Sequence, residues 1–226
     1  MKHGKLIVIE AGDGAGKATQ TELLYKRLDA EKYDVRRVSF PDYESAASGP
    51  IKMYLGGEFG QEPGQVNPYA AATFYAVDRY ASFQKHWREF YESGGIVLAD
   101  RYVPSNMAHQ AVKINDPAAK KDFLAWLDDL EYNRLSLPRP DTVIFLDMEP
   151  AVAQKLRRNR ADKVAGDIHE QNENYLSRCY EAYQKLTDEY KWHRIICSKN
   201  GEPLSTEQIH AAVYSAVKST ITRENQ

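Results

Sequence analysis

The sequence predicts an α/β fold, a three-layer sandwich in which a five-stranded parallel sheet is flanked by helices. Short apolar runs rich in β-branched residues recur along the 226-residue chain, and longer stretches with helical spacing separate them. Continuous apolar runs of this length are typical of buried parallel strands. Alternation of strand and helix favours a parallel sheet joined by right-handed crossovers. The expected strands are 5–10, 35–39, 96–100, 142–147 and 193–197.

The helix expected at 68–93 has the clearest boundaries. Asn67 can cap its first turn, and Pro68 stands where no amide hydrogen is required. Gly94 and Gly95 end the helix and lead the chain into the next strand. The other expected helices lie near 17–31, 48–55, 104–113, 117–131, 149–160, 169–190 and 204–221.

Composition restricts the class of protein. The formal net charge is −2, with 27% charged and 42% apolar residues, which argues against general binding to nucleic acid or an anionic membrane. The apolar runs are strand-sized, and the N-terminal segment is too short and too polar for a signal peptide. Cys179 and Cys197 show no metal or disulfide spacing, so a reducing cytoplasm is expected. We expect a single domain over 1–226 with a disordered tail at 222–226.

The segment EAGDGAGKATQ, residues 10–20, joins the first expected strand to the first expected helix. A strand, a glycine-rich turn, Gly-Lys and a helix form the context of a phosphate-binding loop. The usual pattern continues with Ser or Thr, but Ala18 follows Lys17 here, which removes a hydroxyl ligand of Mg²⁺. Ala11 replaces the first glycine of the pattern, at a cost that depends on its backbone angle. The dinucleotide-binding fingerprint fails, because Lys17 stands where its third glycine is required. The predicted phosphate-binding residues are Gly12, Asp13, Gly14, Ala15, Gly16, Lys17, Ala18 and Thr19.

Four motifs in this order resemble those of the thymidylate kinases, which belong to the phosphate-loop nucleoside monophosphate kinases. They are the loop with Asp13, FPDY at 40–43, FYAVDRY at 74–80 and ADRYVPSNMAHQ at 99–110, with a weaker arginine-rich segment at 157–170. The resemblance covers almost the whole chain. It implies transfer of the γ-phosphoryl group of ATP to dTMP, giving dTDP and ADP, with Mg²⁺ as cofactor. It also implies a homodimer packed through helices that flank the long one.

The resemblance assigns catalytic roles to several of these residues. Asp13 would accept a hydrogen bond from the 3′-hydroxyl of the acceptor sugar, and Lys17 would lie between the β- and γ-phosphates. Arg101 would contact the dTMP phosphate and the transferred group with its planar fork of donors. Asp100 would orient Mg²⁺ through water, and Asp13 and Glu170 are further metal candidates.

The same resemblance outlines a pocket for dTMP. Tyr75 and Arg79 lie four residues apart on the long helix and share one face. The Tyr75 ring would stack on thymine, and Arg79 would bind a carbonyl oxygen of the base. Asn106 would pair with the amide edge of thymine, and His109 would lie near the 2′ position of the sugar, where many relatives have a tyrosine. The complete expected set is Asp13, Phe40, Pro41, Tyr43, Tyr75, Arg79, Arg101, Ser105, Asn106 and His109.

A lid that is mobile without ligand is expected over 157–168. Some relatives carry an arginine in the phosphate loop, at the position of Gly14, whereas others supply arginines from the lid. Arg158 or Arg160 is therefore expected to neutralise charge in the transition state, an effect of about 10³- to 10⁵-fold in related chemistry. Arg157 is a candidate wall of the adenine site.

Two other functions are compatible with these residues. The first is another nucleotide or deoxynucleoside kinase, which a panel of substrates would distinguish. The second is a nucleotide-binding pseudokinase, because Ala18 lacks the hydroxyl. Retention of the charged residues favours an active kinase, since Mg²⁺ readily keeps several waters and one can stand where the hydroxyl would be.

Overall fold

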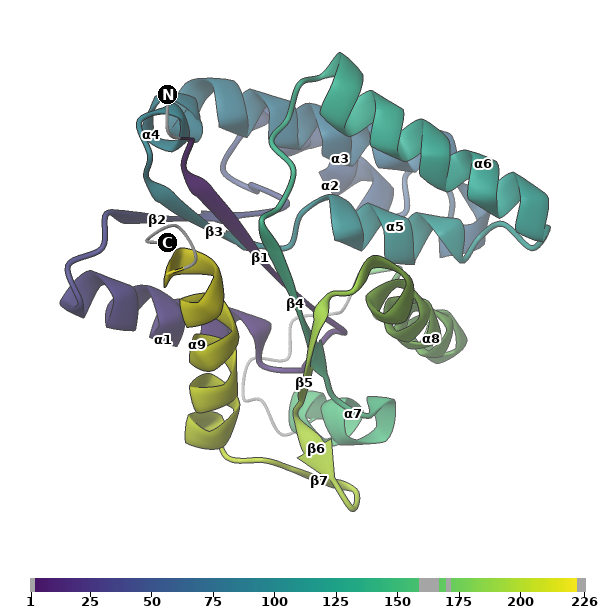
Figure 1. The fold of residues 1–226 in the computed structure, drawn as a ribbon. Coiled ribbons are helices and arrows are strands. Elements are labelled where there is room, and N and C mark those ends of the chain that lie inside the picture. The colour runs from purple at the N-terminus through teal and green to yellow at the C-terminus, as the bar shows by residue number, and fades with distance from the viewer. Residues whose placement is uncertain (1–2, 159–166, 170–171, 223–226) are drawn as a thin grey trace.

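The computed structural model describes residues 3–158, 167–169 and 172–222, and its fold is the predicted α/β sandwich (Figure 1). Its five predicted strands form one sheet in the order β2-β3-β1-β4-β5, and every neighbouring pair is parallel. The prediction of a five-stranded parallel sheet is therefore confirmed. The strands are β1 Lys5–Ala11, β2 Val35–Ser39, β3 Ile96–Asp100, β4 Thr142–Asp147 and β5 His193–Ile196.

Helices cover both faces of the sheet, with α1 and α9 on one face and α3, α5 and α6 on the other (Figure 1). Side chains alternate along β1, so that Ile7 and Ile9 pack in the core under α1 and α9. Leu6 and Val8 face the opposite core, which includes residues of α3 to α6. The helices are α1 Lys17–Ala30, α2 Gly49–Leu55, α3 Pro68–Ser82, α4 Arg88–Glu92, α5 Val103–Ala111, α6 Pro117–Asp128, α7 Pro150–Arg158, α8 Glu173–Tyr190 and α9 Thr206–Thr222.

The carboxyl ends of the central strands meet at one edge of the sheet. Ile9 of β1 pairs with Asp100 of β3, and Ala11 pairs with Leu146 of β4. The loop that follows β1 therefore lies beside the residues that follow β3. In open parallel sheets, this edge is where ligands bind.

The helix predicted over 68–93 is divided into three segments. It begins at Pro68 as predicted, and the Asn67 side chain accepts a hydrogen bond of 2.8 Å from the Tyr69 amide. However, α3 ends at Ser82, and a wider π-helical turn at 83–87 separates it from α4. The turn buries the rings of its first and last residues against each other, with centroids 4.6 Å apart.

Three other predicted boundaries are corrected. The helix predicted over 117–131 ends at Asp128, and a second π-helical segment, Asp129–Arg134, carries Glu131 into the interior. Helix α8 begins at Glu173 rather than at 169, because the Asn172 side chain caps it. Helix α9 includes Thr222, which was predicted to lie in a disordered tail, while residues 223–226 lie outside the described residues.

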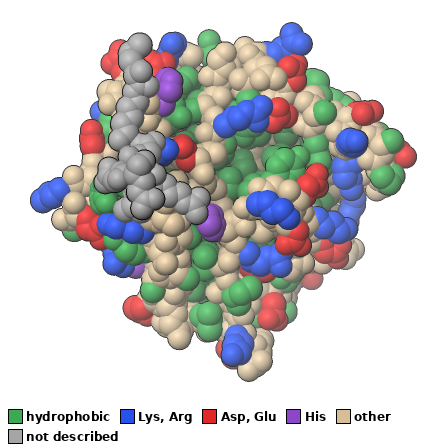
Figure 2. Space-filling view, in the orientation of Figure 1, with side chains coloured by type: hydrophobic (Ala, Val, Ile, Leu, Met, Phe, Trp, Pro, Cys, Tyr) green, Lys and Arg blue, Asp and Glu red, His purple; other side chains and the backbone are tan. Residues whose placement is uncertain are grey.

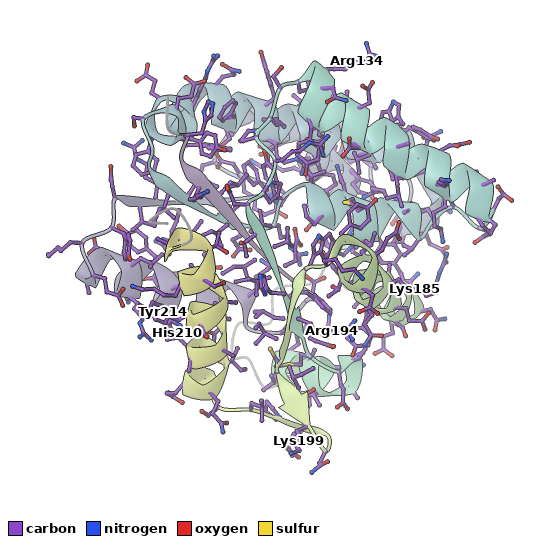
Figure 3. All side chains as sticks on the ribbon, in the orientation of Figure 1. Arg134, Lys185, Arg194, Lys199, His210 and Tyr214 are labelled. Carbon is purple, nitrogen blue, oxygen red and sulfur yellow. The ribbon has the colours of Figure 1, made fainter. Side chains whose placement is uncertain are left out.

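A small hairpin was not predicted. Strands β6 (Ser198–Lys199) and β7 (Glu202–Pro203) pair antiparallel, and Lys199 lies near its end (Figure 3). Asn200 and Gly201 connect them with positive φ angles of 55° and 75°. Two positive φ angles are the requirement of a type I′ turn, for which Asn-Gly is the preferred pair. The dipeptide was thus an available signal for this hairpin.

The contact between α1 and α9 is partly polar. His210 and Tyr214 lie on the side of α9 that faces α1 (Figure 3). The Arg27 guanidinium stacks 3.3 Å from the centre of the Tyr214 ring, and the Tyr214 hydroxyl donates to Glu31 at 2.7 Å. Such amphipathic side chains seal the edge of a core while their charges stay in water.

The helices and the surface charges bear on membrane and polyanion binding. No helix within the described residues is both long and apolar enough to cross a bilayer. On the face shown in Figure 2, basic and acidic side chains are interspersed. A polyanion would need a continuous basic area, which this face does not present.

Candidate active site

The phosphate loop adopts the backbone that its glycines predict. Gly14 and Gly16 have positive φ angles of 86° and 80°, and α1 begins directly after Gly16 at Lys17. Ala11 is the buried last residue of β1 and does not have a positive φ angle. The replacement of the first glycine by Ala11 therefore introduces no backbone strain.

Gly14 also makes room for a neighbouring helix. A Cβ atom at this position would lie 2.5 Å from Arg157 Cγ and 2.8 Å from the Ala153 carbonyl oxygen. Both residues belong to α7, so this helix packs directly on the loop. Arg157 thus occupies the space beside the position where some relatives carry a loop arginine.

Lys17 forms an ion pair with Asp100 at the end of β3. Burial of the side chain, together with the nearby charge of Arg101, lowers the pKa of Lys17 to about 7. This pair joins the phosphate loop to the end of β3. Ala18 and Thr19 are exposed at the start of α1.

A second ion pair joins Asp13 to Arg101. Burial raises the pKa of Asp13, but the combined charge of Arg101 and other neighbours, among them Lys17, outweighs this effect, and the pKa lies below its ordinary value. Arg101 has a φ angle of 68°, which is uncommon for a residue other than glycine. Its Nη1 atom also donates to the Ala11 carbonyl oxygen at 3.3 Å. The loop and the end of β3 are therefore held together by two cation–carboxylate pairs.

A cavity of about 160 Å³ adjoins Asp13 and Arg101. All ten residues predicted to contact dTMP line it, although they come from four separate parts of the chain. Five other lining residues were not predicted from the sequence. These are Leu55, Tyr102, Gln110, Asp167 and His169.

The Arg79 guanidinium is already engaged by an acidic partner. Its Nε atom donates to Glu131 at 3.0 Å, and Nη2 makes a second bond to the same carboxylate. Both side chains are fully buried, with 1% and 0% exposed. Arg79 lines the cavity, but only the donors that Glu131 does not use can serve a ligand.

The orientation of Asn106 is also fixed by a protein partner. Its Nδ2 atom donates to the Ala72 carbonyl oxygen at 3.0 Å. This bond uses one of the two amide hydrogens, so Oδ1 and the second hydrogen are what Asn106 retains for a ligand. The Tyr75 ring lines the same cavity and contacts the Tyr54 ring edge-on, with centroids 6.4 Å apart.

Two stacked histidines form another part of the cavity wall. The rings of His109 and His169 are 5.7 Å apart and inclined by 15°. Burial lowers the pKa of His109 to about 4, and it also lowers the pKa of His169. The Tyr175 hydroxyl lies 3.4 Å from His109 Nδ1, whereas Nε2 has no hydrogen-bond partner among the described residues. His109 lines the cavity, and it keeps one buried ring nitrogen without a partner among the described residues.

His169 is held by a short chain of polar groups. Lys113 Nζ donates to the Tyr54 hydroxyl at 2.7 Å, and this hydroxyl lies 2.6 Å from His169 Nε2. The Tyr54 hydroxyl accepts from Lys113, and the direction of its bond with His169 Nε2 depends on the tautomer of the histidine. His169 could not be predicted from the sequence, because a single histidine beside the expected lid has no distinguishing pattern.

The described part of the lid is limited to its two ends. Arg157 lies in the last turn of α7, and the Ile168 amide donates to the Leu55 carbonyl oxygen at 3.3 Å. Arg160 and Glu170 lie outside the described residues, as does the side chain of Arg158. Their predicted roles therefore stay predictions.

A second cavity, of about 350 Å³, lies on the other side of the phosphate loop. This cavity lies between the start of α1 and the segment that connects β7 to α9. Its walls are largely apolar, and Arg157, the predicted adenine contact, does not line it. The lining residues include Ala15, Thr19, Met148, Leu156, Pro203 and Leu204.

The acidic residues fit a metal that arrives with a nucleotide. No group of three or more His, Cys, Asp or Glu side chains in the described part of the chain could hold a metal ion. Asp100 and Asp13 nevertheless lie beside the phosphate loop, paired with its two cations. Mg²⁺ commonly binds one or two carboxylates together with substrate phosphates and waters, which is the set these residues could complete.

The fold and the site together define a phosphate-loop nucleotide kinase, because a phosphate loop lies between two cavities and is flanked by Lys17 and Arg101. A family model described as thymidylate kinase matches residues 9–210. The chain belongs to the thymidylate kinase family.

Individual relatives agree with this assignment. The thymidylate kinase of Mycobacterium tuberculosis strain H37Rv is 34% identical over 185 residues, which cover 80% of this chain and 85% of the relative. A probable thymidylate kinase of Thermococcus gammatolerans is 32% identical over 220 residues, 96% of this chain and 98% of the relative. The thymidylate kinase of Schizosaccharomyces pombe is 27% identical over 225 residues, 98% of this chain and 95% of the relative.

Proposed function

We propose that this protein transfers the γ-phosphoryl group of ATP to dTMP, giving dTDP and ADP. The observation that carries the proposal is the cavity beside Asp13 and Arg101, which is lined by all ten residues that the family resemblance predicts. Family membership gives independent support. The pairing of an acceptor cavity with a second cavity across the phosphate loop is what transfer between two nucleotides requires.

Catalysis would consist of alignment and charge neutralisation. Phosphoryl transfer needs little covalent chemistry from the protein, and its rate depends on how the reacting groups are placed. Lys17 would bind the phosphates of ATP, and Arg101 would bind the phosphate of dTMP and the group in transfer. Arg158 or Arg160 would add positive charge when the lid segment 157–168 closes.

Mg²⁺ would be the cofactor, with Asp100 as its principal protein contact through water. When bound with ATP, Mg²⁺ neutralises phosphate charge during transfer. Asp13 lies close enough to assist, and Glu170 stays a further candidate. The missing hydroxyl at Ala18 would be replaced by a water, so Ala18→Ser should change the Mg²⁺ requirement only modestly.

The acceptor cavity would select dTMP by its base and its sugar. Tyr75 and Phe40 offer rings for stacking, and the free Oδ1 atom of Asn106 suits the N–H group of thymine. Asp13 would accept from the 3′-hydroxyl. His109, which lines the cavity, would lie near the 2′ position of the sugar.

The adenine of ATP would occupy the cavity between α1 and the segment after β7. This cavity is next to the loop residues that would bind the phosphates, and its apolar walls suit a purine ring. Leu156 of this cavity directly precedes Arg157 in α7, so Arg157 stays a candidate neighbour of the adenine site.

We also propose a cytoplasmic homodimer. Val77 and Tyr80 are 49% and 41% exposed on one face of α3, and an exposed apolar helix face is typical of an association surface. Light scattering should give the mass of two chains, and Val77→Glu should reduce it to one. A single-chain mass for the unmodified protein would reject the dimer.

The decisive experiment is a coupled assay of ADP formation with ATP, Mg²⁺ and a panel of nucleoside monophosphates. We expect dTMP to be the preferred acceptor over dUMP, dCMP and dAMP. Preference for another monophosphate would reject thymidylate specificity. Binding of ATP without turnover of any acceptor would instead identify a nucleotide-binding protein that has lost catalysis.

A further inference from the structure

A carboxylate that does not contact either cavity lies behind the candidate active site. Glu10 is the penultimate residue of β1, and its side chain is completely buried. It occupies the sheet face on which Leu6 and Val8 pack, where strand alternation calls for an apolar side chain. A charge in such a layer is costly unless it is fully hydrogen-bonded, so its retention calls for a specific role.

Three donors from three different elements converge on Glu10. The Tyr102 amide donates to Oε1 at 2.9 Å. The Ser105 hydroxyl of α5 and the Tyr183 hydroxyl of α8 donate to Oε2 at 2.6 and 2.8 Å. Both oxygens of the Glu10 carboxylate thus accept hydrogen bonds. Because the Ser105 and Tyr183 hydroxyls use their hydrogens in these bonds, each can only accept from any other partner.

Those lone pairs face Arg101. The hydroxyl oxygens of Ser105 and Tyr183 each lie 3.4 Å from Arg101 Nη1. Nη2 is paired with Asp13 on the other side. The guanidinium is thus directed toward the acceptor cavity by groups that Glu10 orients.

Glu10 also stabilises the unusual backbone of Arg101. The Arg101 amide donates to the Ile9 carbonyl oxygen at 3.1 Å, and the next amide, that of Tyr102, donates to Glu10. These two bonds hold the peptide on either side of the residue with a φ angle of 68°. A non-glycine residue keeps such a conformation only when its surroundings enforce it.

We propose that Glu10 and Tyr183 are positioning residues that hold the Arg101 guanidinium and backbone in the geometry needed to bind the acceptor phosphate. Neither residue lines the acceptor cavity, so neither would touch the substrate. The inference rests on the proposed function, in which Arg101 contacts the phosphate of dTMP. In addition, Glu10 of β1 and Tyr183 of α8 determine the orientation of this arginine.

Tyr183→Phe removes one hydroxyl and preserves the ring that stacks on Phe145 with centroids 5.2 Å apart. We expect it to lower kcat and the affinity for dTMP by about 10- to 100-fold, the effect of one hydrogen bond to a charged group. KM for ATP should stay within about twofold, since Lys17 binds those phosphates. Tyr180→Phe is the matched control on the same helix, because the Tyr180 hydroxyl binds Asp147 instead.

A double-mutant cycle separates positioning from a purely structural role. If Tyr183 acts through Arg101, Tyr183→Phe should change the activity of an Arg101→Lys enzyme by no more than about twofold. Effects that multiply would overturn the inference. Glu10→Gln should reproduce the pattern, and if it does not fold, Tyr183→Phe alone still decides the matter.

A readout independent of turnover keeps the two proposals separate. Calorimetric titration with dTMP measures acceptor binding directly, and Tyr183→Phe should weaken it only when Arg101 is present. A native protein that forms no dTDP rejects the proposed function, whatever the titration shows. Unchanged dTMP binding and unchanged kcat in both Tyr183→Phe and Glu10→Gln would overturn the positioning role.

Discussion

Removal of the acidic partner of Arg79 should strongly destabilise the fold. Glu131→Gln keeps the size of the side chain but leaves the guanidinium, which is 1% exposed, without a counter-charge. Breaking a buried ion pair in this way costs about 3–5 kcal/mol. For a chain of this length, that corresponds to a fall in Tm of roughly 6–20 °C.

A neighbouring ion pair provides the control. Asp128 and Arg139 form a bidentate pair at 2.6 and 2.7 Å, but their side chains are 45% and 56% exposed. Because water screens exposed charges, Asp128→Asn should cost no more than about 1 kcal/mol. Each substitution replaces the carboxylate partner of an arginine by an amide, and the two sites differ mainly in how deeply the ion pair is buried.

Thermal unfolding, followed by calorimetry, measures both effects. Removal of both charges, by Arg79→Met with Glu131→Leu, should recover much of the lost stability, because no unpaired charge remains. The same double variant should bind dTMP poorly, since Arg79 lines the acceptor cavity. A destabilisation of 1 kcal/mol should lower the Tm by at least about 2 °C. The reasoning would be refuted if the Tm of Glu131→Gln lay within about 2 °C of the native value.

Three other predictions address the loop, the acceptor cavity and the lid. Gly14→Ala should destabilise the protein by about 1–3 kcal/mol, because of its positive φ angle and the contact with α7. Gly12→Ala, which meets no described atom within 4 Å, should cost less in the same denaturant titration. The pKa of His109 falls from 6.5 to about 4 on folding. Between these two pH values the unfolded chain therefore binds more protons than the folded chain. The free energy of unfolding should decline by up to roughly 3 kcal/mol as the pH falls through this window. His109→Phe should flatten that decline in urea titrations at pH 6.5 and 4, and an unchanged slope would exclude His109 as its source. Arg158→Ala and Arg160→Ala should lower kcat far more than they change dTMP affinity in steady-state assays, and native turnover in both would remove the lid arginines from catalysis.

The sequence predicts the layers of this fold well, because its strongest signals are local. Strand β3 has the predicted bounds of 96–100, and α3 begins at Pro68 after its Asn67 cap. The wide turn at 83–87 could not be seen, since apolar residues spaced by four suit both an α-helix and a π-helical turn. Helix starts with a chemical cap are thus predictable, whereas changes of helical pitch depend on tertiary packing.

The candidate site was predictable where a motif defines it and not where distant residues complete it. The ten expected acceptor residues line one cavity. Glu131 was not foreseen as the partner of Arg79, because a glutamate in the segment DDLEY has the pattern of a solvated helix face. Glu10 and Tyr183 were not foreseen because their importance arises only from a contact across 173 residues of sequence.

The two ion pairs at the phosphate loop have a consequence for how ligands bind. Lys17 and Arg101 are each matched by a carboxylate, so the site is close to electrically balanced before any phosphate arrives. Nucleotide binding is then an exchange of partners rather than a simple attraction. When phosphate takes the Lys17 ammonium, Asp100 is left with an uncompensated negative charge beside the same phosphates. Affinity for the nucleotide and affinity for a divalent cation are therefore coupled through one carboxylate, and each should be measured in the presence of the other.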